Sequence, residues 1–234
     1  MIHNSKPVSP RLLPARLQRL YILGSAAVDR GDLPGAAVQL SAHGEATDAR
    51  AFGRFSPVPD APPMQPDSIF LVASITKPVV VSAVVLLAER GHLLLDEPAS
   101  RYMPEFGVNG KESISLRHLM THTSGMPDML PENQALREAH ASMNEFIRRI
   151  CDLTPDFPAG TGIQYQSAGI AILGEIVSRV SGLPLRDFLR EEIFQPLGMD
   201  DTALGMGGLP RARLSLVNVP TEQEGPGWGW NSDD

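Results

Sequence analysis

Residues 69–91 read IFLVASITKPVVVSAVVLLAERG and form the most apolar stretch of the chain. From Val79 to Ala88 the residues are apolar on nearly every side of a helix, which predicts a helix that is buried all round. Pro78 is compatible with this helix if the helix begins near Ser74, because the N–H groups of a first turn have no partner within the helix. Gly91 is a suitable residue to end it.

The start of this stretch carries the pattern S-x-x-K, which places Ser74 and Lys77 one helical turn apart on the same face. A serine hydroxyl is a poor nucleophile until a neighbouring base takes its proton, and a lysine that its surroundings keep neutral can be that base. The pattern also arises by chance, since serine is a common residue. Its position before a buried helix favours the functional interpretation, because a lysine there is costly unless it has partners or a task.

A second candidate is the segment Tyr165-Gln166-Ser167, which comes directly before an apolar helical pattern. A tyrosine near Lys77 could shuttle protons, and the short polar side chain of Ser167 could face the same cavity. The alternative is structural. Tyrosines in turns before a helix usually pack or cap, and Ser167 could cap a helix that begins at Ala168.

Two histidines, His118 and His122, stand four residues apart, which would place both on one face of a helix, as in zinc-binding helices. No glutamate adjoins His118 and no third ligand follows at a familiar spacing, so we expect neither a metal site nor a cofactor. Cys151 lies at helical spacing from Ile147, and we interpret it as a small core residue rather than a nucleophile.

The composition excludes several classes of protein. The chain has 234 residues, of which 42% are hydrophobic and 20% charged, as in ordinary globular proteins. Its net charge of -7 repels phosphate backbones, so general nucleic-acid binding is not expected. The longest apolar run is about half of the ~20 residues that a membrane-spanning helix needs. Residues 1–30 lack the pattern of a signal peptide, so we expect a cytoplasmic location, unless a misassigned start hides a leader for secretion or the periplasm.

Apolar periodicity predicts further helices and one hairpin. The helices are expected at Pro14–Asp29, Leu116–Thr121, Met143–Cys151, Ala168–Ser181 and Leu185–Phe194. Residues 37–43 alternate like a half-buried strand, Gly44 permits a turn, and residues 46–52 are the returning strand. We expect a single domain over residues 1–234, with a loose lead-in at residues 1–13 and an irregular tail at residues 205–234.

Five stretches, in order, resemble the beta-lactamase-related serine hydrolases, a family that includes class C beta-lactamases, D-alanyl-D-alanine carboxypeptidases and esterases of the same fold. They are Ser74–Pro78, Leu93–Phe106, Ile114–Met126, Tyr165–Gly174 and Ile193–Met199. The first resembles the nucleophile motif of the family, the third closely resembles a segment that is characteristic of the family, and the fourth resembles its tyrosine motif. One such stretch would be weak evidence, but five in the family's order are strong.

The resemblance implies an α+β, beta-lactamase/transpeptidase-like fold, with a helical region beside an antiparallel sheet. It makes Ser74 the acylated nucleophile, Lys77 its proton-handling partner and Tyr165 the general base or shuttle. The backbone N–H of Ser74 would be one oxyanion donor. Ser167, a substrate-binding position, stands where many relatives have asparagine, which weakens the expectation of lactam recognition and is compatible with an esterase.

The function that the resemblance implies is hydrolysis of a small-molecule ester or amide through an acyl-enzyme on Ser74. An esterase or carboxypeptidase-like hydrolase is expected rather than an antibiotic-degrading beta-lactamase. Two alternatives stay open. The chain could be a catalytically inactive relative that at most binds acyl compounds or a partner, or it could transfer the acyl group to an alcohol or amine.

One family motif is absent from the sequence. Relatives carry Lys-Thr-Gly or His-x-Gly on a strand well after the tyrosine, whereas here no lysine follows Lys111 and no histidine follows His140. We therefore expect a truncated chain in which the C-terminal strands and final helix of the fold are missing. The hairpin over residues 37–52 would then lie at an open sheet edge, which predicts self-association.

Overall fold

The computed structural model describes residues 13–58 and 60–215, which fall into two compact units. The described part of the first unit comes from residues 13–71 and 208–215, and the second unit is residues 72–207. The expected lead-in at residues 1–13 lies outside the described residues except for Leu13, and most of the expected tail lies beyond residue 215. The prediction of a single domain stays a prediction.

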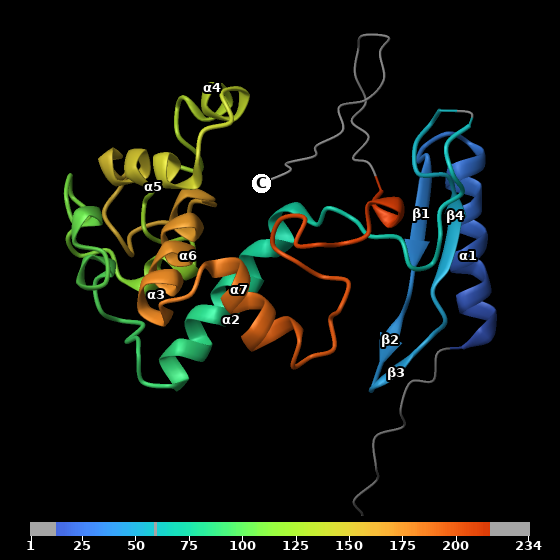
Figure 1. The fold of residues 1–234 in the computed structure, drawn as a ribbon, viewed down its shortest axis with the longest axis horizontal. Helices are drawn as coiled ribbons and strands as arrows, with labels where there is room; N and C mark the ends of the chain where they lie inside the picture. The colour runs from blue at the N-terminus through green and yellow to red at the C-terminus, as the bar shows by residue number, and fades with distance from the viewer. Residues whose placement is uncertain (1–12, 59, 216–234) are drawn as a thin grey trace, which may run out of the picture. The chain divides into compact units, whose positions relative to one another are not determined.

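Among the described residues, the first unit contains one α-helix and one hairpin (Figure 1). Its elements are α1 (Pro14–Asp29), β1 (Gly35–Val38), β2 (Ser41–Ala42), β3 (Glu45–Ala46) and β4 (Arg50–Gly53). The predicted helix and antiparallel hairpin are confirmed, but each predicted strand is divided in two. Val38 pairs with Arg50 and Ser41 pairs with Ala46, so two residues on one strand oppose three on the other. The extra residue is a bulge, which interrupts the ladder.

Helix α1 packs on β4 through aromatic side chains. The rings of Tyr21 and Phe52 lie 6.3 Å apart, and the Arg50 guanidinium lies 4.4 Å from the centre of the Tyr21 ring. Near the other end of this unit, Ile69 exchanges backbone hydrogen bonds with Arg213 and Ser215. The segment expected to be irregular from residue 205 therefore pairs with Ile69 and contains the short helix Arg211–Arg213. Trp228 and Trp230 lie outside the described residues.

The second unit is helical. Its elements are the 3-10 turn Ala73–Ile75, α2 (Thr76–Glu89), the 3-10 turns Ala99–Arg101 and Pro104–Phe106, α3 (Leu116–Met120), α4 (Asn133–Glu138), α5 (Met143–Asp152), α6 (Ala168–Ser181), α7 (Leu185–Leu189) and a π-helical turn Arg190–Phe194. Each helix predicted here is confirmed to within one or two residues, except that the predicted helix Leu185–Phe194 is α-helical only to Leu189 and continues as the π-helical turn. Helix α4 was not predicted, because its single buried apolar residue, Leu136, sets no period.

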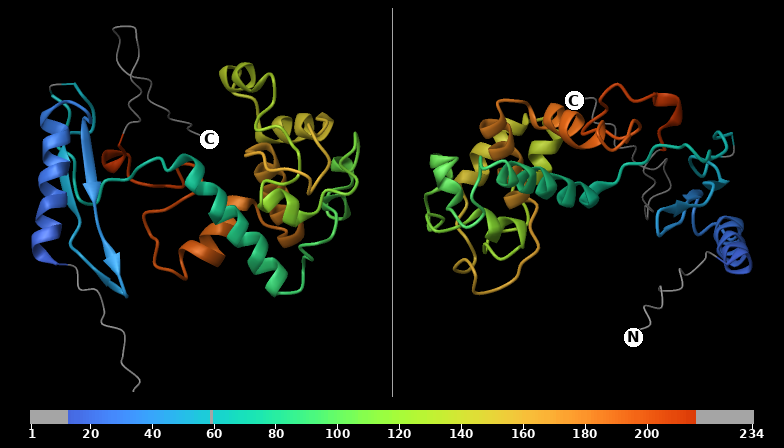
Figure 2. Two further views of the ribbon diagram at one scale, coloured as in Figure 1. Left: turned by 180° about the vertical axis from the view of Figure 1, so that it is seen from behind. Right: turned by 90° about the horizontal axis from the view of Figure 1, so that it is seen from below.

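Helix α6 is the centre of the second unit. It contacts α2, α3, α5 and α7, and α2 also lies against α7 (Figure 2). Ile172, Leu173, Ile176 and Val177 of α6 are fully buried. Gly182 ends the helix in the left-handed conformation that glycine adopts without strain. These apolar contacts give the unit one continuous core.

The expectation that α2 is buried all round is wrong for one of its faces. Val80, Ala83, Val84 and Leu87 are buried, but Val85 is 38% exposed. Apolar composition by itself did not distinguish the buried face of α2 from the exposed face, because valines occupy both.

Within residues 13–58 and 60–215, no single helix is long and apolar enough to cross a membrane. Helix α6 and residues 185–194 reach the length and apolar composition of a membrane span only when they are counted together, and they are bent by 80° relative to each other. The same described residues contain no group of histidine, cysteine and carboxylate side chains that could hold a metal ion.

The loop after α3 is bonded along its length to the loop before α6. Gly160 and Asp156 donate backbone hydrogen bonds to the carbonyls of Thr123 and Gly125, each at 2.8 Å. The approach is closest at Gly125, which has a φ of +77° and where an added Cβ would lie 2.0 Å from the Phe157 carbonyl oxygen. Only glycine fits this contact.

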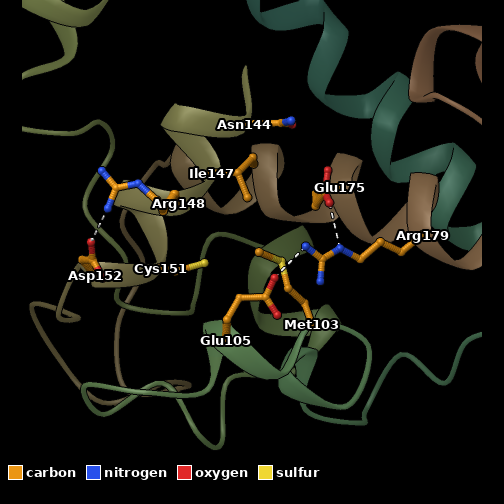
Figure 3. Close-up of a pocket in the computed structure, with 9 residues that line it drawn as sticks. All are labelled: Met103, Glu105, Asn144, Ile147, Arg148, Cys151, Asp152, Glu175 and Arg179. Carbon is orange, nitrogen blue, oxygen red and sulfur yellow. Dashed lines mark hydrogen bonds and ion pairs between the residues drawn. The ribbon is translucent and has the colours of Figure 1, made fainter. Parts of the chain in front are cut away.

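A hollow of about 370 Å³ lies between α5, α6 and the turn Pro104–Phe106 (Figure 3). Its charged side chains are paired with one another: Arg179 binds Glu105 at 2.6 Å and Glu175 at 2.7 Å. Cys151 forms part of its lining, and burial raises the pKa of this thiol to about 11. The hollow therefore has neither an unneutralised charge among these side chains nor a reactive nucleophile, which agrees with the interpretation of Cys151 as a core residue.

Replacing Gly125 by alanine is expected to destabilise the second unit strongly. Gly91, which follows α2, is the matched control, because it has the same φ of +77° but no atom within 4 Å of an added Cβ. Gly91→Ala should cost only the left-handed backbone strain, roughly 1–2 kcal/mol. Gly125→Ala adds the collision with Phe157 and should cost about 3 kcal/mol or more. Chemical denaturation of both variants measures the difference, and equal losses would contradict the close approach.

The Cys151 thiol is expected to resist alkylation in the folded chain. At pH 8 a thiol with a pKa of about 11 holds about 10²-fold less thiolate than an unfolded cysteine. Iodoacetamide should therefore label the native chain at least that much more slowly than the chain in denaturant, as intact mass would show. The chain has a single cysteine, so any adduct reports on this site. Equal labelling rates would show that the thiol is ionised and accessible.

Candidate active site

Ser74 lies at the junction between the 3-10 turn Ala73–Ile75 and α2, and its side chain is exposed. The residue before it, Ala73, has a φ of +45°, in the left-handed region that side-chain-bearing residues rarely adopt. Such a conformation costs roughly 1–2 kcal/mol and is found where a functional residue must be presented in a fixed direction. The chain therefore enters α2 through a strained turn that carries Ser74.

Lys77 lies in the first turn of α2, where the S-x-x-K spacing places it beside Ser74. Its Nζ donates a hydrogen bond to Ser74 Oγ at 3.0 Å. The same amine lies 4.6 Å from the centre of the Tyr165 ring. The predicted pairing of Ser74 and Lys77 on one helical face is confirmed by this contact.

Tyr165 reaches the same hydroxyl from a segment 91 residues away, and its phenol oxygen lies 2.8 Å from Ser74 Oγ. The pKa of Tyr165 is lowered from its ordinary value, first by hydrogen bonding with Lys77 and then by hydrogen bonding with Ser74. Burial and the Asp128 carboxylate act in the opposite direction. The ionised form of the phenol, which can accept a proton, is favoured as a result.

Gln166 is the buried anchor of this segment, and it was not predicted as a site residue. Its side chain is fully buried, with Oε1 accepting a hydrogen bond from the Ser124 hydroxyl at 2.7 Å and Nε2 donating to the Leu119 carbonyl at 3.2 Å. Ser124 is also fully buried and accepts from the Met126 N–H. The one available signal was an amide placed between two polar candidates, just before an apolar helix.

Ser167 occupies the N-cap position of α6 but makes no side-chain capping hydrogen bond. Its backbone N–H donates instead to Asp128 Oδ1 at 2.8 Å, and the Asp128 carbonyl accepts from Ala168 at 2.9 Å. The structural alternative, in which the Ser167 hydroxyl caps α6, is therefore wrong. Asp128, a residue that was not predicted, supplies the negative charge that a helix N-terminus favours.

The two histidines do not share a helical face. His118 lies in α3 and forms a capping box with Ser115, in which its Nδ1 accepts the Ser115 N–H at 3.2 Å. His122 lies beyond the end of α3, with a φ of +60°, and its ring packs against that of Tyr165 with the centres 4.9 Å apart. The four-residue spacing did not reveal this, because the helix ends between the two residues.

The geometry brings a hydroxyl, an amine and a phenol with a lowered pKa to one point. A phenol with a lowered pKa can remove the proton of the Ser74 hydroxyl as Ser74 Oγ attacks an electrophile. Ile75 and Tyr165 are 64% and 49% exposed, so a substrate has open access from the solvent side.

Comparison with known proteins places this chain in a family. The Beta-lactamase family model matches residues 23–231. Esterase EstB from Burkholderia gladioli is 34% identical over 81% of this chain and 51% of its own length, and acyltransferase mokF from Monascus pilosus is 30% identical over 75% and 49%. Among solved structures, the D-amino acid amidase of Ochrobactrum anthropi, complexed with L-phenylalanine, superposes with a TM-score of 0.74. It is 26% identical, over 86% of this chain and 55% of that one.

The chain spans about half the length of the curated relatives it matches. The expected α+β, beta-lactamase/transpeptidase-like fold is confirmed by the family match and the structural similarity, with a helix-rich unit and a small antiparallel sheet among the described residues. The chain therefore belongs to the beta-lactamase family.

Proposed function

We propose that this chain forms the nucleophile-bearing part of a serine hydrolase that cleaves a small-molecule ester or amide through an acyl-enzyme on Ser74. One observation carries the proposal: Ser74 Oγ lies within hydrogen-bond distance of both Lys77 Nζ and Tyr165 Oη, at 3.0 and 2.8 Å. The lowered pKa of Tyr165 supports its role as the base. The esterase and amidase names of its relatives support the substrate class.

The proposed reaction has two halves. In the first, Tyr165 takes the Ser74 proton while Oγ bonds to the substrate carbonyl carbon, and the backbone N–H of Ser74 stabilises the oxyanion. The bond to the leaving group then breaks, and the leaving group takes the proton from Tyr165. In the second half, a water molecule gives a proton to Tyr165, and the oxygen of that water adds to the acyl carbon. Collapse releases the acid and returns the proton to Ser74, while the charge of Lys77 favours the ionised phenol throughout.

Hydrolysis of an ester or simple amide is favoured over lactam cleavage because Ser167 stands where many relatives have asparagine, which weakens the expectation of lactam recognition. The proposal that Ser167 contacts substrate rests on its half-buried position two residues from Tyr165. Acyl transfer is the second candidate, and it is supported by the 30% identity with a protein named as an acyltransferase. Product analysis with an added alcohol or amine acceptor separates transfer from hydrolysis.

Ser74→Ala should abolish acylation and leave the fold nearly unchanged, since it removes one exposed polar atom. The measurement is the mass gained from a fluorophosphonate or penicillin reagent, with the modified residue located by peptide mapping. The parent should gain one adduct at Ser74. A chain that never gains one supports the rival interpretation, a relative that binds acyl compounds without reacting.

Lys77→Arg and Tyr165→Phe should each slow acylation greatly while changing stability little. Arginine keeps the charge, but its longer, planar guanidinium does not reproduce the single Nζ donor that lies 3.0 Å from Ser74 Oγ. Tyr165→Phe removes the base and should cost the ~10²–10⁴-fold that is typical of lost acid–base catalysis. Tyr102→Phe is the matched control, because the Tyr102 hydroxyl binds the Leu94 N–H in the structure, not Ser74. Turnover of an aryl ester at the parent rate by both site variants would refute the proposed proton transfer.

Residues 1–234 expressed alone should turn over an activated aryl ester very weakly and should associate. Ile75 and Tyr165 are exposed, so these residues alone do not exclude water or hold a substrate, and the sequence has no second Lys- or His-based motif after Tyr165. Within the described residues, β1 and β4 pair only with each other, which leaves an unpaired edge on each strand. Light scattering and steady-state kinetics against Ser74→Ala test this. A monomer with efficient, Ser74-dependent turnover would overturn it.

A further inference from the structure

The segment that carries Tyr165 is held on both sides by one residue, His122. The carbonyl of His122 accepts the N–H of Gln164 at 2.9 Å, and its Nδ1 accepts the N–H of Gln166 at 3.3 Å. These two donors flank Tyr165 in the chain. The imidazole also packs against the phenol ring, with centres 4.9 Å apart and planes inclined by 40°.

The backbone conformation of His122 directs both its carbonyl and its side chain toward this segment. Its φ of +60° lies in the left-handed region, which turns the chain at the end of α3 so that both the carbonyl and the side chain face the segment 164–166. A side chain other than glycine in this region costs free energy, and histidine is among the residues that tolerate it better. The strained backbone at His122 is stabilised by its contacts with residues 164–166.

The charge state of His122 fits an acceptor role. Burial first, and the charge of Lys77 second, lower the pKa of His122, whereas the Asp128 carboxylate raises it. These groups and the Tyr165 phenol are the titratable groups that act on or contact the ring. Nδ1 is therefore unprotonated at neutral pH and can accept from Gln166, which leaves the ring proton on Nε2.

We propose that His122 is a positioning residue for the reaction on Ser74: it holds the Tyr165 side chain in contact with both Lys77 and the nucleophile. The proposal deepens the proposed function and rests on it. His122 touches neither the Ser74 hydroxyl nor the Lys77 amine through a hydrogen bond in the structure. Its effect passes through the orientation of Tyr165.

The consequence can be measured on Tyr165 itself. If the ring is released, the phenol loses the contacts with Lys77 and Ser74 that lower its pKa, so the pKa must rise toward that of free tyrosine. The chain has three tyrosines, so NMR of ring-labelled tyrosine resolves each, and Tyr165→Phe assigns the signal of interest. This readout does not depend on turnover.

The test compares His122→Ala, His122→Asn and the control His140→Ala in the full 234-residue chain. His140 has a similar φ of +50° and an exposed side chain after α4, so its replacement measures the effect of alanine at a left-handed position. Asparagine tolerates that conformation and offers an amide oxygen that can replace Nδ1 as acceptor. The two measurements are the ionisation midpoint of Tyr165 and the rate of fluorophosphonate labelling of Ser74.

His122→Ala should raise the Tyr165 midpoint and slow labelling by about 10–100-fold, as expected when a reacting group is misplaced. His122→Asn should fall between His122→Ala and the parent, and His140→Ala should match the parent in both measurements. An unchanged midpoint in folded His122→Ala, even with a lower melting temperature, overturns the proposal. If His122→Ala does not fold, an unchanged midpoint in His122→Asn does so. If the parent is never labelled, the proposed function fails, and the midpoints still decide the role of His122.

Discussion

Tyr165 reaches Ser74 because the chain before α6 is bonded at several points to the loop that follows α3. The buried hydrogen bond between Ser124 and Gln166 is the centre of this connection, since both side chains are withdrawn from water. A buried amide without a partner costs about 1–3 kcal/mol, so the two loops are stable only together. The exposed Tyr165 side chain, which contacts Ser74, is thus next in the chain to a buried residue whose polar atoms all have partners.

Exposed and buried polar residues alternate along the short segment 165–167. Tyr165 is half exposed, Gln166 is fully buried, and Ser167 is half-buried at the start of α6. Successive side chains of this segment thus lie in different surroundings, so the anchor and the reacting group can be neighbours in the chain. Gly169 completes the fit, because a Cβ there would lie within 2.8 Å of the Gln166 amide.

The sequence predicted those features that depend on local pattern. Helices α1 and α6 have the predicted bounds, because proline or a polar turn begins each one and glycine lies one or two residues beyond its last residue. The Ser74–Lys77 contact follows from helical spacing alone. The bulge between Ala46 and Arg50 was not predictable, since a one-residue slip leaves the alternation of each strand intact. Gln166, Asp128 and His122 were missed for another reason: their partners lie about 40 residues away or across two loops.

The left-handed conformation of Ala73 restricts how this site can be redesigned. A β-branched side chain at that position would collide with its own backbone, whatever its polarity, so valine, isoleucine and threonine are excluded. Glycine, asparagine and aspartate are the residues best suited to replace alanine there. A combinatorial library aimed at new acyl specificity would therefore gain little diversity from the position beside the nucleophile. It would gain more from Ile75 and Ile163, whose side chains are exposed.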